Sequence, residues 1–425
     1  MMMNNFLTLY GYELKKIVKR RIAINTLATL TLAVIYINIG GTLNTFHSWN
    51  DNDGNVITMN GFEWLDYQKE KTKELNGQVI DDELLDKVRE AYKNLYRTEY
   101  HGEAGSGYSS MTVVEHGDGE ESIEEAEAEI RSQELYNPIY AYIQRLTGFY
   151  DAVHIIREET LYESRQDNLL EQEWVFLHLT EAERLYWTER ENDVEKPFTY
   201  GYAEGWNEML DSFMYANIML VLAIAICLSS VFADEHLKRT DQLILCSRHG
   251  KGRLFFAKTA ASITFGALCS VFMFIIFLLS ALIVYGAEGS NIVIQICRPL
   301  CSRSLTMGQA VFLMGGIYVV LGIVHSILTI FLSEAVKSAI AVLGIMMGGM
   351  LFTMAYQVPY LHRVVSQIYE LLPTRILNVE QLWDGRLVTV FGLQLTNYQT
   401  AIILYAAVGM LLIWKGNRIW QKLKN

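Results

Sequence analysis

Charged residues are almost absent from several long stretches of this 425-residue chain. A soluble globular domain mixes charged and apolar residues along its whole length, so this segregation argues against a soluble protein and favours a membrane protein. Only between about Asn44 and Asp211 is the sequence strongly charged. The chain therefore combines apolar segments that can cross a bilayer with one large polar insertion.

Cysteine is scarce, with five residues in the chain and none between positions 44 and 212. The fold of the polar insertion must therefore depend on core packing and not on disulfides. Cys297 and Cys301 share one short loop, where a disulfide and a pair of free thiols are both compatible with the sequence. The other three cysteines are expected to be reduced packing residues: Cys227, Cys246 and Cys269.

Catalytic and nucleotide-binding signatures are also missing. The chain contains no H-E-x-x-H, G-x-S-x-G or C-x-x-C motif, and the Gly-Lys-Gly at 250–252 lacks the glycine-rich lead and the hydroxyl residue of a phosphate loop. Residues 51–55 open like a calcium loop, but Val56 and Phe62 stand where Gly and Glu are needed, so a turn is expected. We therefore predict no catalytic residue, no metal site and no cofactor bound by this chain itself.

Six stretches contain the roughly 20 apolar residues that a helix needs to cross about 30 Å of hydrocarbon. They are Ile22–Leu43, Phe213–Phe232, Thr259–Tyr285, Ala310–Leu332, Ala339–Val358 and Thr396–Trp414. The first is too long for a cleavable signal peptide, and no small-residue cleavage site follows it. We predict an α-helical polytopic membrane protein with six transmembrane helices and a mainly helical extracellular domain inserted between spans 1 and 2.

The orientation follows from the distribution of Lys and Arg over the short loops. With the N-terminus in the cytosol, sixteen basic residues lie in cytosolic segments and five in short outer loops. The cytosolic segments are 1–21, 233–258, 333–338 and 415–425, and the outer loops are 286–309 and 359–395. We predict a bacterial plasma-membrane protein with both termini in the cytosol and residues 44–212 outside the cell.

Three regions result from this topology. Residues 1–43 hold an amphipathic N-terminal helix and the first span, residues 44–212 form the acidic extracellular domain, and residues 213–425 contain the remaining five spans. The helix of the second span is expected to begin before the bilayer, near Gly205 and Trp206. In the last outer loop, apolar residues from Leu361 to Leu372 predict an amphipathic helix at or in the outer membrane surface.

The extracellular domain carries helical patterns. An apolar stripe runs along Asp81–Tyr100 at i, i+3, i+4 spacing, and Thr180 with Glu183 fits a capping box that opens a helix over Glu181–Glu191. The acidic run Glu120–Glu129 suits either a cationic ligand or a simply soluble surface. Aromatic residues are expected to supply the core: Trp64, Tyr92, Tyr136, Phe149, Trp174, Phe176 and Trp187.

Polar residues inside the predicted spans are few. His325 lies near the middle of the fourth span, where an ionisable residue is a functional candidate, although a neutral His bonded to nearby backbone is a simpler explanation. Gly344 and Gly348 form a small-xxx-small pair in the fifth span, which permits close helix contact within the chain or with a second one.

The cytosolic loop 233–258 is the most informative segment. Phe232 and Glu235 at the end of one span, an apolar-Ser-basic stretch, and Lys258 at the opening of the next resemble the permease subunits of type-2 ABC exporters. Arg239 stands where many members have Gly. In that family the loop forms a coupling helix on the ATPase, which here implies the contact residues Phe232, Glu235, Thr240, Leu243, Ser247, Arg248, Arg253 and Lys258.

The resemblance implies further expectations. A separate cytosolic ABC ATPase would bind ATP and Mg²⁺, and two permease protomers, identical or related, would pair through the first and fifth spans around Gly344 and Gly348. Gram-positive members linked to peptide export or antimicrobial-peptide immunity have a similarly enlarged outer domain. We therefore predict export of a peptide or antimicrobial compound, with the bilayer and the ATPase as partners and no nucleic acid.

The alternative is a membrane-anchored sensor whose outer domain binds a peptide and signals through a cytosolic partner. The lack of a catalytic constellation disfavours an intramembrane enzyme.

Overall fold

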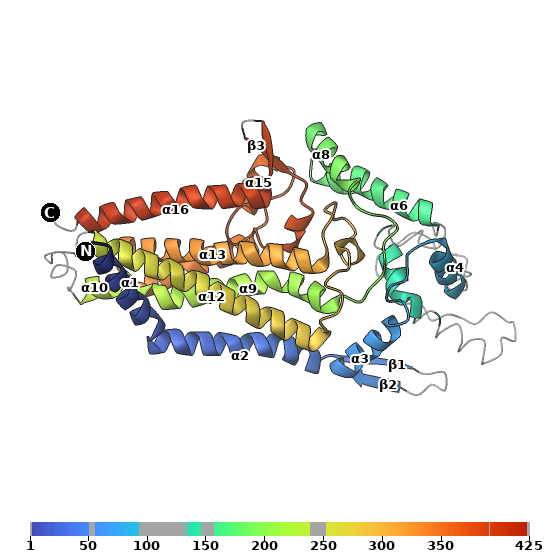
Figure 1. The fold of residues 1–425 in the computed structure, drawn as a ribbon, viewed down its shortest axis with the longest axis horizontal. Coiled ribbons are helices and arrows are strands. Elements are labelled where there is room, and N and C mark those ends of the chain that lie inside the picture. Colours follow the sequence, from blue (N-terminus) through green and yellow to red (C-terminus); the bar gives the residue numbers. More distant parts are fainter. Residues whose placement is uncertain are drawn as a thin grey trace, which may run out of the picture.

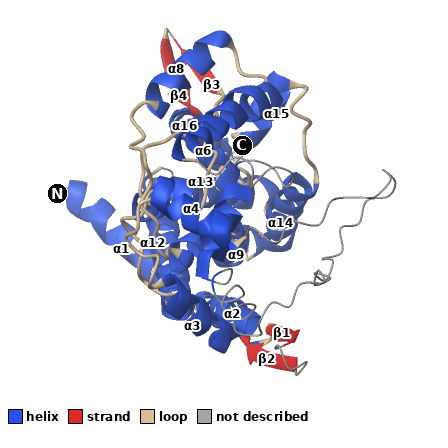
Figure 2. Cartoon of the chain, turned by 90° about the vertical axis from the view of Figure 1, so that its right-hand side faces the viewer, coloured by secondary structure: helices blue, strands red, loops and turns tan. Residues whose placement is uncertain are grey.

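The computed structural model describes residues 2–50, 56–92, 132, 135–144, 146, 157–238, 252–390 and 392–422. Long helices run side by side along the longest axis of the molecule, with both termini at one end (Figure 1). A second group of shorter helices and two hairpins covers the opposite end (Figure 2). The protein is therefore an α-helical membrane protein with one polar domain seated on the end of its bundle.

Five helices in the described residues have the length and apolar composition to cross a membrane. They are α2 (Arg21–Leu43), α9 (Glu204–Leu228) continued by α10 (Ser230–Leu237), α12 (Arg253–Tyr285), α13 (Met307–Val336) and α16 (Asn397–Lys422). The sixth predicted span corresponds to α14 (Ala339–Ala355), which is apolar but has only 17 residues. It ends at Ala355 instead of Val358, because the backbone is already extended at Tyr356.

The bundle is held by apolar contacts between these helices. Phe213, Phe232 and Tyr318 are among the largest fully buried side chains, and they belong to one continuous core that joins α9, α10, α12, α13 and α16. The α14 helix packs against α9 through a separate small cluster around Met346. Tyrosine, serine and asparagine side chains inside the bundle find hydrogen-bond partners across helices, such as Asn38 donating to Ser280 at 2.6 Å.

Local sequence signals account for many helix ends. The helix α1 (Met2–Val18) precedes α2 as predicted, and α9 begins at Glu204, one residue before the predicted Gly205. A Thr306–Gln309 capping box opens α13. Thr180 and Glu183 form the predicted capping box of α8 (Glu181–Glu191).

The polar domain is built from short helices and a hairpin. They are β1 (Phe46–Asn50), β2 (Val56–Asn60), α3 (Gly61–Thr72), α4 (Asp82–Ala91), α6 (Glu158–Asp167), the π-turn η1 (Asn168–Glu173), α7 (Trp174–Phe176) and α8. The strands pair antiparallel, with Phe46 opposite Asn60. The predicted helix Asp81–Tyr100 is confirmed as far as Ala91, whereas the acidic run Glu120–Glu129 and Phe149 lie outside the described residues.

The aromatic core was predicted only in part. Tyr92, Trp174 and Trp187 are buried as expected. Phe176 is not: its side chain is 58% exposed and its ring lies 5.0 Å from that of Tyr360 in the last outer loop. The prediction of a buried Phe176 was therefore wrong. It rested on residue type alone, and the residue type of one aromatic side chain does not show whether that side chain is buried.

The last outer loop contains the other elements missed by sequence reasoning. After the predicted amphipathic helix, α15 (Arg363–Glu370), a 3₁₀ turn η3 (Val379–Leu382) leads into a hairpin of β3 (Leu387–Val390) and β4 (Leu393–Thr396). The turn places Gly392 at a φ of 83°, which favours glycine. A shorter 3₁₀ turn, η2 (Ile294–Ile296), lies in the loop between α12 and α13.

Candidate functional site

A dense cluster of polar side chains lies at the end of the bundle that carries both termini. It is arranged around the bend between α9 and α10. The Ser333 hydroxyl of α13 accepts hydrogen bonds from the backbone of Phe232 and Ala233, both at 3.1 Å, and donates to the carbonyl of Ser229 at 2.6 Å. One side chain thus satisfies the backbone groups that a bend leaves open. The direction in which α10 leaves the bundle is therefore fixed by α13.

A buried ion pair lies at the centre of this cluster. The ammonium group of Lys258, at the start of α12, is fully buried and pairs with the carboxylate of Glu235 in α10. It also donates to the carbonyl of Val231 at 3.2 Å and lies 5.1 Å from the centre of the Phe232 ring. A buried cation is tolerated only when such partners replace its water. The pair therefore joins the two helices that flank the segment 239–251.

The N-terminal helix reaches the same cluster. Lys16 places its ammonium 3.8 Å from the Glu235 carboxylate, and Arg20, two residues after the end of α1, donates to the Ser230 hydroxyl at 2.6 Å. Nearer the start of α1, the Tyr10 hydroxyl donates to Thr264 of α12 at 3.1 Å. The helix is thus fastened to α10 and α12 by polar contacts as well as by its buried Ile17.

The C-terminal helix completes the cluster. Trp420 of α16 is fully buried, with its ring 5.5 Å from that of Phe232 and 6.4 Å from the imidazole of His236. His236 in turn lies 3.1 Å from the carboxylate of the buried Glu334 at the end of α13. Elements far apart in sequence therefore meet at one point: α1, α10, α12, α13 and α16.

The structure brings together three of the residues predicted to couple to a partner, namely Phe232, Glu235 and Lys258. Arg253 begins α12, five residues before Lys258. The remaining four lie outside the described residues: Thr240, Leu243, Ser247 and Arg248. Sequence reasoning missed Lys16, His236, Ser333, Glu334 and Trp420; the Ser333-Glu334 pair at the end of an apolar run was the signal that could have found two of them.

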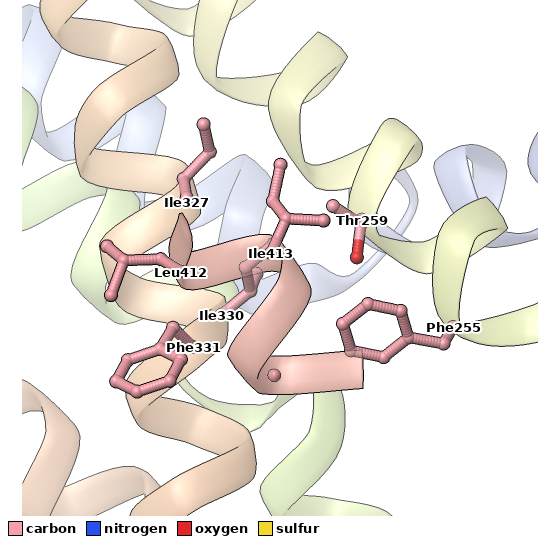
Figure 3. Close-up of a pocket in the computed structure, with 8 residues that line it drawn as sticks. Phe255, Thr259, Ile327, Ile330, Phe331, Leu412 and Ile413 are labelled. Atoms are coloured by element: carbon pink, nitrogen blue, oxygen red, sulfur yellow. The ribbon is translucent and has the colours of Figure 1, made fainter. Parts of the chain in front are cut away.

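A small hollow lies beside the cluster, between α12, α13 and α16 (Figure 3). Phe255, which packs against Phe232, forms one wall, and aliphatic side chains form most of the rest. Thr259 also lines the hollow, and its hydroxyl group has no hydrogen-bond partner among the described residues. Among the described residues, no three His, Cys, Asp or Glu side chains gather as a metal site would require.

His325 has a side-chain partner. Its Nε2 lies 3.3 Å from the Oδ1 of Asn217 in α9, and the amide of Asn217 donates to the carbonyl of Pro373 at 3.0 Å. The simpler expectation of a bond to nearby backbone is therefore wrong. The contact instead links α13, α9 and the last outer loop inside the bundle.

Gly344 and Gly348 face open space among the described residues. A Cβ atom added at either position would meet no heavy atom of this part of the chain within 4 Å. The role of this glycine pair in helix packing, within the chain or between two chains, stays a prediction.

No disulfide joins the two loop cysteines in this structure. The Cys301 thiol is buried and donates to the carbonyl of Leu382 at 3.7 Å, while Cys297 is half-buried against the apolar core. Burial raises the pKa of the Cys301 thiol, which disfavours its reactive thiolate form.

At the opposite end, the polar domain is clamped to the outer loops. Arg363 of α15 donates two hydrogen bonds to the carboxylate of Glu183 in α8, at 2.5 and 2.7 Å, and the backbone of Leu387 donates to the same group at 2.7 Å. Arg165 of α6 is fully buried, pairs with Glu191 and donates to the carbonyl of Pro299 at 2.8 Å. The domain therefore holds both outer loops through buried charged groups.

The clamp should respond to acid. Burial alone would raise the pKa of Glu183, but the hydrogen bonds from Arg363, Leu387 and Thr180 outweigh it and hold the pKa below its usual value. A carboxyl with a lowered folded-state pKa stabilises the fold at pH values above its unfolded pKa, and it loses that contribution as the pH falls through the folded-state pKa.

Replacing Glu183 by Gln is therefore expected to lower the melting temperature at pH 7, and the difference in melting temperature should shrink below about pH 4. Melting curves of both proteins in detergent from pH 3 to 7 measure this; a constant difference at all pH values would contradict it.

Comparisons with protein-family models, curated proteins and solved structures find no match to this chain.

Proposed function

We propose that this chain is the membrane-spanning permease subunit of an ATP-driven exporter of the type-2 ABC kind, working as a dimer with a separate ATPase. In this proposal α14 is the sixth span, both termini face the cytosol, and residues 44–212 lie outside the cell. The observation that supports it best is the buried Lys258–Glu235 pair, which ties together the two helices that flank the segment 239–251.

The supporting argument is mechanical. A partner that pushes on residues 239–251 would move the start of α12 and the end of α10 together, because Lys258 and Glu235 hold them. Ser333 and Trp420 would pass that movement to α13 and α16. The proposed ATPase would bind ATP and Mg²⁺, and the transported molecule would be a cationic or amphipathic peptide or another antimicrobial compound.

The first experiment is purification of the tagged protein from its native membrane in mild detergent, followed by mass spectrometry. We expect a soluble ATPase in stoichiometric amount, and at least a tenfold reduction of it when Arg248 is replaced by Glu. Lys15, an exposed residue of α1 at the same end of the bundle, supplies the control: Lys15→Glu should leave the ATPase bound. Reproducible absence of any ATPase from the intact protein would contradict the proposal.

A membrane-anchored sensor is the second candidate, and the clamp at the outer end favours it. Because Arg363 and Arg165 tie the polar domain to both outer loops, a ligand bound to that domain would displace the ends of the transmembrane helices directly. Ligand-dependent ATPase activity without uptake of the same ligand into inverted membrane vesicles would identify a sensor. Uptake that depends on ATP would identify an exporter.

A further inference from the structure

The amphipathic helix α15 is oriented opposite to that of a soluble protein. Its polar residues Ser366 and Glu370 are 1% and 5% exposed, while Val364 and Ile368 are 67% and 61% exposed. In water, such a helix would bury its apolar stripe and expose its polar one. The apolar face of α15 therefore requires a non-aqueous neighbour, and the described residues do not supply one.

The polar face is held in place by specific partners. Ser366 accepts a hydrogen bond from Arg386 at 2.8 Å, and Glu370 accepts from Arg375 at 3.0 Å and from Gln381 at 3.1 Å. Turning the helix over would leave these buried donors without acceptors, at a cost of about 1–3 kcal/mol for each. The orientation is therefore determined by the loop and is not a loose arrangement of a surface helix.

The position of α15 relative to the ends of the bundle helices follows from the contacts of the residues directly after it. The carbonyl of Leu371 accepts from the Tyr405 hydroxyl of α16 at 2.7 Å, and that of Pro373 accepts from Asn217. Tyr405 lies eight residues after the start of α16, which is about 12 Å along a helix. The chain thus enters the membrane-spanning bundle directly after α15, and α15 itself lies at the level where α16 begins (Figure 1).

Two other segments expose apolar side chains beside α15. Phe176 of α7 contacts Tyr360, three residues before α15, and Leu361 is 75% exposed next to it. Leu393, at the tip of the hairpin that follows, is 68% exposed. The exposed surface continues into the end of the apolar helix α14, where Phe352 is 67% exposed and its ring stacks on that of Tyr356, which contacts Tyr369 of α15. We call the group formed by Phe176, Leu361, Val364, Val365, Ile368 and Leu393 the apolar rim.

We propose that the apolar rim is a lipid-contact surface that lies in the boundary between headgroups and acyl chains of one leaflet. Its depth, its continuity with the membrane face of α14 and the inverted orientation of α15 all favour lipid over a protein partner. Through Phe176 and the Glu183–Arg363 pair, the rim also seats the polar domain on the bilayer surface. This inference does not depend on the proposed transport function.

The experiment places a fluorescent NBD label at single cysteines introduced in a variant whose five native cysteines are replaced by alanine or serine. The labelled positions are Leu361→Cys, Ile368→Cys and Leu393→Cys, in phosphatidylcholine nanodiscs that contain either no quencher or 5-doxyl phosphatidylcholine. We expect at least a twofold loss of fluorescence at all three positions. Leu185→Cys is the matched control, because Leu185 is 64% exposed on the face of α8 opposite to Glu183 and Trp187, and it should keep its fluorescence.

A second quencher distinguishes the other occupants. If iodide in the buffer quenches the three labels and the doxyl lipid does not, the rim faces water and the proposal is overturned. If neither quencher reaches them, a second copy or another protein covers the rim, which also overturns it. Since the three positions lie on three segments, namely the turn before α15, α15 itself and the hairpin, misfolding of one variant, detected by size-exclusion chromatography, leaves the test intact.

Discussion

Replacing Lys258 by Met is expected to destabilise the protein by about 3–5 kcal/mol, the usual cost of leaving one charge of a buried pair without its partner. Met preserves most of the aliphatic stem, so the loss would come from the Glu235 carboxylate, which then lacks its buried cation, and from the carbonyl of Val231, which loses a donor. Lys16 lies 3.8 Å from the same carboxylate and would compensate only partly, because its side chain is about half exposed. Thermal unfolding in detergent, followed by fluorescence-detected size-exclusion chromatography, measures the change.

The double variant Lys258→Met with Glu235→Gln separates charge from packing. Removing the second charge should restore a large part of the lost stability, since no uncompensated ion remains. Lys15→Met removes an exposed cation from the same end of the bundle and should change the stability by less than about 0.5 kcal/mol. Equal effects of Lys258→Met and Lys15→Met would show that the pair is not buried as described.

Arg386→Met is expected to have an effect of similar size at the opposite end of the bundle. The guanidinium of Arg386 is fully buried, bonds both carboxylate oxygens of Asp384, donates to Ser366 and stacks 4.8 Å from the centre of the Tyr360 ring. Without it, Asp384 keeps only the Asn397 amide at 3.0 Å and its local backbone contact. We expect a loss of about 3–5 kcal/mol, by the same physical argument.

The loss should be largest in the loop that Arg386 holds together. Because Ser366 would lose its donor, amide exchange should accelerate by a larger factor in α15 and the hairpin β3–β4 than in α12 and α13. Hydrogen–deuterium exchange with mass spectrometry detects this difference. The matched control is Arg190→Met, an exposed arginine whose guanidinium lies 5.1 Å from the Tyr186 ring and outside this network. Uniformly faster exchange in all helices would mean that Arg386 supports the whole fold instead of the outer loop.

Patterns within one turn or one helix were predictable from the sequence. The capping box of Thr180 and Glu183 was found because its two members are three residues apart, and the start of α9 because its apolar run is preceded by helix-forming residues. The hairpin β3–β4 was missed although Gly392 lies between two short runs rich in Val and Leu, since only helices were predicted in this loop. Such short elements are decided by their tertiary surroundings more than by their own propensity.

The candidate sites were predictable only as separate residues. Glu235 and Lys258 were singled out by the resemblance of their loop to that of type-2 ABC permeases, yet nothing in the sequence indicates that Trp420 packs beside them. The same is true of Glu183 and Arg363, which are 180 residues apart. Contacts over such separations depend on how the helices pack, and a single sequence carries no local signal for that packing.

By itself, the sequence determined that this is an α-helical membrane protein with a large polar insertion, because a helix must present about 20 apolar residues to satisfy its backbone inside hydrocarbon. The requirement is one of composition and length, and both can be read along the chain. Only the tertiary structure decided which face of α15 is buried and which charges meet at each end of the bundle. Those outcomes depend on buried polar groups such as Arg386 and Lys258 finding partners, and the partners come from elements that are distant in sequence.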